Sequence, residues 1–189
     1  MKEGWELKKL GEVCEVRGGA TPLRSNELFW ENGDIPWFTI DDIRDQGRII
    51  SSTKQKVTAF ALKKLTLYPK NTVLLCCTAS VGEYAITTIP LTSNQQFNGL
   101  TIKNINEIFP FFLFYYCSTL KEKLLSLSGK TTIDFVSSAK IKDLDIFLPP
   151  LSEQQHIVEI LDTAFAKIDS VKQNAERNLQ NAKELFQSV

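Results

Sequence analysis

The chain has 189 residues, 43% of them hydrophobic and 10% aromatic, which suits one well-packed domain with a short extension. The formal net charge is zero, yet residues 46–82 hold six lysines and arginines and no acidic residue, so this segment favours a polyanionic partner. The four cysteines lack the spacing of a disulfide framework or a zinc site, and the most apolar run, residues 108–117, is too short to span a bilayer. We therefore expect a reduced, cytoplasmic protein without metal or cofactor.

Short segments rich in β-branched and aromatic residues, bounded by turn residues, predict strands in the first part of the chain. Helical patterns are fewer there. The composition therefore indicates an α+β fold, a mixed and β-rich domain over residues 1–150. The predicted strands are residues 12–17, 35–40, 72–77, 83–89, 97–102 and 144–149, and the predicted helices are 57–65, about 106–127 with Asn106 as N-cap, and a turn near 137–144.

The last part, residues 151–189, predicts one long helix. Pro149 and Pro150 end the strand before it, Ser152 and Gln155 have the spacing of a capping box, and no glycine or proline follows. At 1.5 Å per residue the helix would be roughly 55 Å long, more than a core helix of this domain needs. We expect it to form a separate extension.

Apolar residues recur along this helix in alternating steps of four and three, the spacing of a coiled-coil seam. Asn178 is the one polar position, where a buried amide could fix the register. The head of the same chain cannot cover so long a stripe, so the pattern predicts a partner helix. The alternative is a helix folded back over its own domain. The predicted helix-partner interface consists of Ile157, Leu161, Ala164, Ile168, Val171, Ala175, Asn178, Ala182, Leu185 and Val189.

No constellation of catalytic residues stands out. The sequence lacks the glycine-rich motifs that bind nucleotide phosphates, and His156 is the only histidine. A dyad of His156 with Cys76 or Cys77 is formally possible, but cysteines in an apolar strand are more often inert packing. The chain is therefore predicted to bind rather than to catalyse.

Several loops combine glycine, hydroxyl, amide and basic residues, the groups that contact DNA. The same composition is also ordinary turn chemistry. Beside the acid-free segment it favours a DNA-reading surface, with basic residues on phosphates and the amides of residues 94–96 on base edges. The predicted DNA contacts are Arg17, Gly19, Thr21, Arg24, Lys54, Lys56, Ser80, Asn94, Gln95, Gln96, Lys130 and Thr131.

Together, several stretches resemble the DNA specificity subunits of type I restriction-modification systems. They are GWELKKLGEVCEVRGGATP, ENGDIPWFTIDDI, TVLLCCTASVGEYAI, SNQQFNGLTI and SGKTTIDFVSSAKIKDLDIFLPPLSEQQHIVEILD. The resemblance covers essentially the whole chain, and the LPPLSEQ stretch is its most specific part. It implies a non-catalytic subunit in which a target-recognition domain, residues 1–150, is followed by a coiled-coil spacer and dimerisation helix, residues 151–189.

Full-length members of that family carry two such units in tandem, whereas this sequence holds one. The resemblance therefore implies a half-subunit that reads one half of a bipartite site on double-stranded DNA. It also implies three partners: adenine methyltransferase subunits, an ATP-dependent restriction subunit with translocase and nuclease activity, and a second copy or second half-subunit bound through the long helix. Two other interpretations stay open, a coiled-coil adaptor whose head binds protein and a small hydrolase that uses a cysteine.

Overall fold

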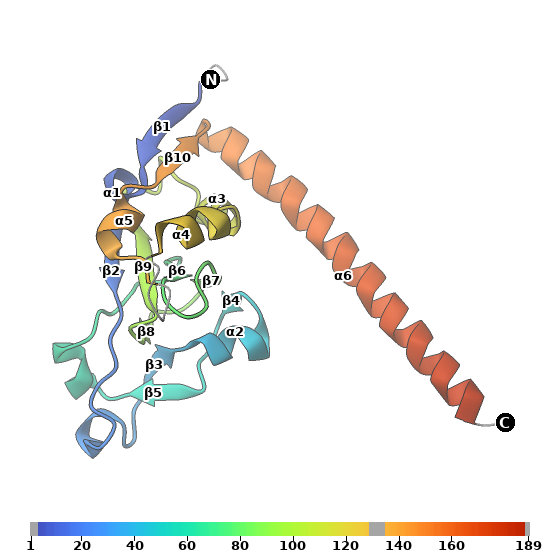
Figure 1. The fold of residues 1–189 in the computed structure, drawn as a ribbon, viewed down its shortest axis with the longest axis horizontal. Coiled ribbons are helices and arrows are strands. Elements are labelled where there is room, and N and C mark those ends of the chain that lie inside the picture. Colours follow the sequence, from blue (N-terminus) through green and yellow to red (C-terminus); the bar gives the residue numbers. More distant parts are fainter. Residues whose placement is uncertain (1–3, 129–134, 188–189) are drawn as a thin grey trace.

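A mixed five-stranded sheet organises the amino-terminal part of the chain, and a long helix leaves it (Figure 1). The computed structural model describes residues 4–128 and 135–187, with side chains through residue 184. Neighbouring strands of the sheet are antiparallel, except that the edge strand β4 runs parallel to β7. In spatial order the strands are β2 (Cys14–Gly18), β9 (Phe97–Ile102), β6 (Val73–Cys76), β7 (Tyr84–Thr87) and β4 (Ile49–Ile50).

The central strand β6 is buried on both faces, which explains its uninterrupted apolar sequence. Val73 and Leu75 point into the larger core, whereas Leu74 and Cys76 point into a second core on the opposite face. Helices cover the first face, and they are α1 (Leu10–Val13), α3 (Pro110–Ser118), α4 (Lys121–Leu127) and α5 (Ser138–Lys142).

Two smaller sheets complete the head. The three-stranded sheet holds β5 (Gln55–Val57), β3 (Ile35–Phe38) and β8 (Thr92–Ser93), and α2 (Ile40–Gln46) follows β3. The two-stranded sheet pairs β1 (Glu6–Lys9) with β10 (Asp145–Leu148), so the two ends of the head meet where the long helix begins (Figure 1). The prediction of a mixed α+β fold followed by one long helix is confirmed.

The predicted strands all contain a strand, but three of them were predicted two residues too long at one end, and most other ends shift by one residue; the segment 83–89 holds a strand only from Tyr84 to Thr87. The segment 12–17 begins as a strand only at Cys14, because α1 takes up Leu10–Val13. The segment 35–40 is a strand only to Phe38, because Thr39 is the N-cap of α2 and its backbone N–H donates to Asp42 Oδ2 at 2.7 Å. The sequence did not predict α1, α2 or the short strands β1, β4, β5 and β8.

The helix predictions in the head were less accurate. Within the segment 57–65, Val57 ends β5 and only Ala59–Lys63 turn as a 3-10 helix. The helix predicted from Asn106 begins instead at Pro110, whose fixed φ suits the first helical position, and it breaks near Thr119 into α3 and α4.

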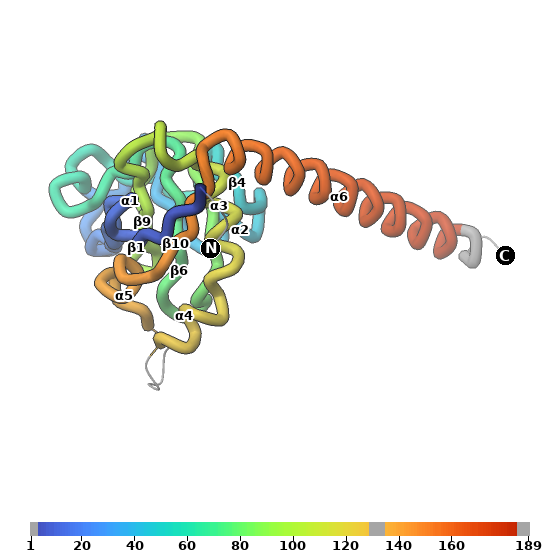
Figure 2. The backbone as a smooth tube through the Cα atoms, turned by 90° about the horizontal axis from the view of Figure 1, so that it is seen from above, coloured from blue at the N-terminus to red at the C-terminus, as the bar shows by residue number. Residues whose placement is uncertain are grey.

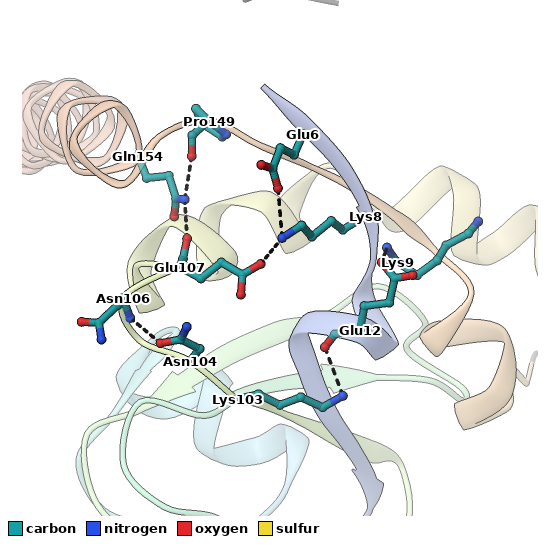
Figure 3. A network of polar contacts seen from close by, with 10 residues as sticks. All are labelled: Glu6, Lys8, Lys9, Glu12, Lys103, Asn104, Asn106, Glu107, Pro149 and Gln154. Atoms are coloured by element: carbon teal, nitrogen blue, oxygen red, sulfur yellow. Dashed lines mark hydrogen bonds and ion pairs between the residues drawn. The ribbon is translucent and has the colours of Figure 1, made fainter. Parts of the chain in front are cut away.

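The long helix α6 (Leu151–Gln187) is anchored by a residue that the capping-box reading passed over. The backbone N–H groups of Glu153 and Gln154 donate to the carbonyl of Pro150, so Ser152 already lies inside the first turn. Gln154 is fully buried and makes three hydrogen bonds. Its Oε1 accepts from the Phe109 N–H at 2.9 Å. Its Nε2 donates to the carbonyls of Glu107 at 2.8 Å and Pro149 at 2.9 Å (Figure 3). The predicted capping role of Ser152 and Gln155 was therefore wrong.

Beyond its first turns α6 leaves the head and extends away from it (Figure 2). Val158 is buried and Leu161 is half-buried, but every side chain from residue 162 to residue 184 is exposed. The alternative of a helix folded back over its own domain is thus excluded for this part of the chain. None of the helices in the described residues combines the length and apolar character needed to cross a bilayer.

Candidate nucleic-acid interface

The segment after β2 packs tightly against the turn after β8. The N–H of Gly19 donates to the Phe97 carbonyl at 2.9 Å, and the Ala20 N–H donates to the Ser93 carbonyl at 2.9 Å. A Cβ on Gly19 would lie 2.2–2.5 Å from atoms of Ser93 and Asn94, so only glycine fits this approach. The contact brings two predicted DNA-binding loops, far apart in sequence, side by side.

The three amides of the turn 94–96 have different surroundings. Asn94 is 8% exposed, its Nδ2 donates to Gln96 Oε1 at 2.9 Å, and its Oδ1 accepts from the Gln96 N–H at 3.0 Å. Gln95 is exposed and accepts a hydrogen bond from the Thr21 hydroxyl. The geometry therefore favours Gln95 as the amide that reaches a ligand, while Asn94 shapes the turn.

Arg24 lies on an aromatic platform beside this turn. Its guanidinium stands 4.0 Å from the ring centre of Trp30 and 4.6 Å from that of Trp37, and the two indoles meet edge to face. Nη1 donates to Gln55 Oε1 at 2.6 Å. The Trp37 indole N–H donates to the Ala20 carbonyl at 3.1 Å, which ties the platform to the Gly19 segment. A guanidinium held over these rings with one N–H bonded to Gln55 keeps further N–H donors for an anion or a base edge.

In the folded chain, acidic side chains from outside the acid-free segment, residues 46–82, neutralise part of its positive charge. Lys54 forms an ion pair with Asp45 of α2, and its backbone N–H donates to Asp42 Oδ1 at 2.8 Å. Arg48 pairs with Glu83 at 2.9 Å. Acidic residues that flank the segment in sequence therefore fold back onto it, and this neutralisation cannot be seen in a linear charge count.

The remaining predicted contacts are more scattered. Arg17 is exposed on β2 and pairs with Glu15 at 2.6 Å. Lys56 is exposed on β5, the edge strand of the three-stranded sheet. Ser80 lines a separate cleft of about 510 Å³ between α2, the loop 78–82 and α4. Lys130 and Thr131 lie outside the described residues.

The cysteines are unsuited to nucleophilic catalysis. All four are buried, and loss of hydration raises the pKa of the Cys14 and Cys77 thiols to about 12 and that of Cys76 above its usual range. His156 is exposed on α6, 3.8 Å from Glu159. The cysteine-hydrolase reading therefore gains no support. Within residues 4–128 and 135–184, no group of three or more His, Cys, Asp and Glu side chains gathers as metal ligands would.

The seam predicted along α6 is mostly uncovered in this chain. Successive residues turn by about 100°, so the seam and the face that holds Gln154 and Val158 lie roughly a quarter turn apart. Ile168 and Val171 on the seam are 58% and 68% exposed. The two faces meet at Ile157 and Leu161, which are half-buried. Ala164, Ala175, Asn178 and Ala182 are exposed, the side chain of Leu185 is not described, and Val189 lies outside the described residues.

The family model for the type I restriction modification DNA specificity domain matches residues 2–179. The chain belongs to this family. This bears out the resemblance drawn from the sequence and the prediction of a specificity chain rather than an enzyme. Two relatives of this specificity domain are the EcoprrI specificity subunit of Escherichia coli, 39% identical over 83% of this chain, and the MjaIX specificity subunit of Methanocaldococcus jannaschii, 34% identical over 97%.

The specificity domain spans less than half of these relatives, 41% of the first and 43% of the second. Solved structures agree on the fold. A chain described under complex assembly and conformational transition of the type I R-M system superposes with a TM-score of 0.79 at 24% identity, covering 98% of this chain and 44% of that one. The HsdS subunit from Thermoanaerobacter tengcongensis gives a TM-score of 0.72 at 23% identity, covering 92% and 40% respectively.

Proposed function

We propose that this chain is a DNA-recognition half-subunit of a type I restriction-modification complex and reads one half of a bipartite target. The observation that carries the proposal is the pairing of one head with one projecting helix whose seam is uncovered. Residues 1–150 would form the target-recognition domain and residues 151–189 the spacer and dimerisation helix. The chain would act in the cytoplasm, where its DNA target lies.

Reading of the half-site would centre on the surface around Trp37, where Gly19, Thr21, Arg24 and Gln95 come together. Lys56 and Arg17 would contribute phosphate contacts at its edges. Gln95 is the proposed base reader because its amide is exposed, and one lost bidentate contact costs about 1–3 kcal/mol of discrimination. Lys54 would contribute less than its charge suggests, because Asp45 already neutralises it.

The second recognition unit would be joined through α6. A second copy of this chain would bring two identical heads to a palindromic target, whereas a different half-subunit would give an asymmetric one. The charged outer faces of α6 would remain available for adenine methyltransferase subunits, and the ATP-dependent restriction subunit would join that assembly. The outer-face residues proposed for this role are Glu159, Lys167, Lys172, Arg177 and Lys183.

The test selects duplexes from a random-sequence DNA library with the purified full chain and sequences those that are retained. We expect a motif of two short half-sites at a fixed separation. Gln95→Ala should relax one position of each half-site. Lys56→Gln should weaken binding to all sequences and reduce the slope of log affinity against log salt by about one.

A coiled-coil adaptor remains the competing interpretation. It predicts weak retention of duplex without a motif and without a steep salt dependence. That outcome, obtained with a correctly folded and dimeric chain, would reject the DNA-recognition role.

A further inference from the structure

The last contact between the head and α6 is an aromatic and polar clamp. The Tyr115 ring, on α3, stacks on Phe165 with ring centres 5.6 Å apart and planes 8° from parallel, and its hydroxyl donates to Asp162 Oδ1. Burial of Tyr115 and the neighbouring Asp162 carboxylate raise the pKa of the phenol, so it remains a protonated donor at neutral pH. Phe165 itself is 48% exposed, and every described side chain of α6 beyond it is exposed as well.

On its head side the clamp rests on rigid packing. The Tyr115 ring meets Phe114 edge to face at 5.1 Å, and Phe114 packs against Tyr84 at 5.1 Å. The guanidinium of Arg48 lies 4.3 Å from the Tyr84 ring centre. Phe114 belongs to the main core, so the clamp connects the helix to a part of the head that cannot shift alone.

The other contacts of α6 lie closer to its start. Gln154 and Val158 hold the first two turns, where a small rotation displaces the helix little. The helix from residue 151 to residue 184 is about 50 Å long, so a tilt of about 10° at its base would move the far end by about 9 Å. At about 3.4 Å per base pair, that displacement corresponds to two or three base pairs of DNA.

We propose that Tyr115, Asp162 and Phe165 are positioning residues that set the angle between α6 and the head, and through it the separation at which two half-sites are accepted. The inference rests on the proposed function for its second step, but the first step, the fixed angle, is independent of DNA. None of the three residues needs to touch DNA or the partner helix.

The angle is tested by spin-label distance measurements on the full chain carrying Ser52→Cys and Gln180→Cys, mixed with excess unlabelled chain. The native cysteines are buried and do not take the label. We expect a narrow distance distribution, which Tyr115→Phe should broaden by several ångströms and Phe165→Ala should broaden further. Asp162→Asn keeps an acceptor for the Tyr115 hydroxyl and should leave the distribution narrow.

Tyr116→Phe is the matched control, because the Tyr116 hydroxyl donates to the Asp145 carbonyl at 2.6 Å within the head. It should change neither the distances nor the spacing. In the duplex-library selection, Tyr115→Phe and Phe165→Ala should keep the half-site sequences of the unaltered chain but accept separations one or two base pairs away.

Unchanged distances in both clamp variants would overturn the inference, as would broadened distances with unchanged spacing preference. If the unaltered chain selects no bipartite motif, the proposed function fails and the spacing step falls with it, while the distance data still decide whether the clamp fixes the angle. Tyr115→Phe retains the ring and the fold, so a negative result cannot be assigned to unfolding.

Discussion

Replacing Gln154 by methionine should destabilise the junction between the head and α6. Methionine has a side chain of similar length but lacks the amide oxygen and nitrogen of Gln154. The Phe109 N–H and the carbonyls of Glu107 and Pro149 would therefore each lose a hydrogen bond. Each buried polar group left without a partner costs about 1–3 kcal/mol. The site lies at the edge of the head, so water can reach these groups after small movements and reduce each penalty. We therefore expect the free energy of unfolding to fall by about 3 kcal/mol in all.

The assay is urea denaturation of the full chain, monitored by tryptophan fluorescence. Trp5 reports on the junction because its indole N–H donates to Glu153 Oε2, in the first turn of α6, at 3.2 Å. Gln155→Met is the matched control, because Gln155 is exposed. It should change the free energy of unfolding by no more than about 0.5 kcal/mol. Equal effects of the two substitutions, or a larger effect at Gln155, would refute the anchoring role and restore the capping-box reading.

Three further outcomes follow from the described contacts. Gly19→Ala should abolish DNA binding and lower stability, as measured by library retention and thermal unfolding, because its Cβ would lie 2.2–2.5 Å from Ser93 and Asn94. Val171→Asp should convert the proposed dimer to a monomer in analytical ultracentrifugation without changing the unfolding of the head, because Val171 is exposed on the seam. The free energy of unfolding should fall as pH rises from about 9 towards 12. Thiols of the unfolded chain ionise near 9.0, whereas burial raises the pKa of Cys14 and Cys77 in the folded chain to about 12. Unfolding in this range therefore releases protons and is favoured by higher pH. A pH titration of unfolding midpoints with thiol-reagent accessibility checks this, and thiols that react in the folded chain at neutral pH would contradict it.

Hydrophobic pattern was the most reliable guide to this fold. It located the central strands and the whole of α6, because burial on both faces of β6 and a stripe along a solvent-exposed helix each leave a regular mark on the sequence. It failed where short elements depend on tertiary contacts. The strand β4 has only two residues and exists because β7 lies beside it, and α2 starts at a capping pair of Thr39 and Asp42 inside a segment rich in strand formers.

The geometry of the candidate site could not be predicted from composition. Glycine, arginine and amide residues singled out several loops, and the structure brings Gly19, Thr21, Arg24 and Gln95 of these loops together. The burial of Asn94 and the pairing of Lys54 with Asp45 depend on the path that the chain takes through its turns, and no local pattern signals them. The anchoring role of Gln154 was missed because two of its three partners, Phe109 and Glu107, lie 45 and 47 residues away in sequence.

The alternation of β6 side chains between two cores also determines how cooperatively the head unfolds. Val73 and Leu75 pack in the core covered by α1, α3, α4 and α5, and Leu74 and Cys76 pack in the core on the opposite face. If either core unfolds, β6 loses the packing on one of its two faces. The head should therefore unfold as a single cooperative block, and a lesion introduced far from the loops, in α3 or α4, would reduce recognition by lowering the fraction of heads that are folded.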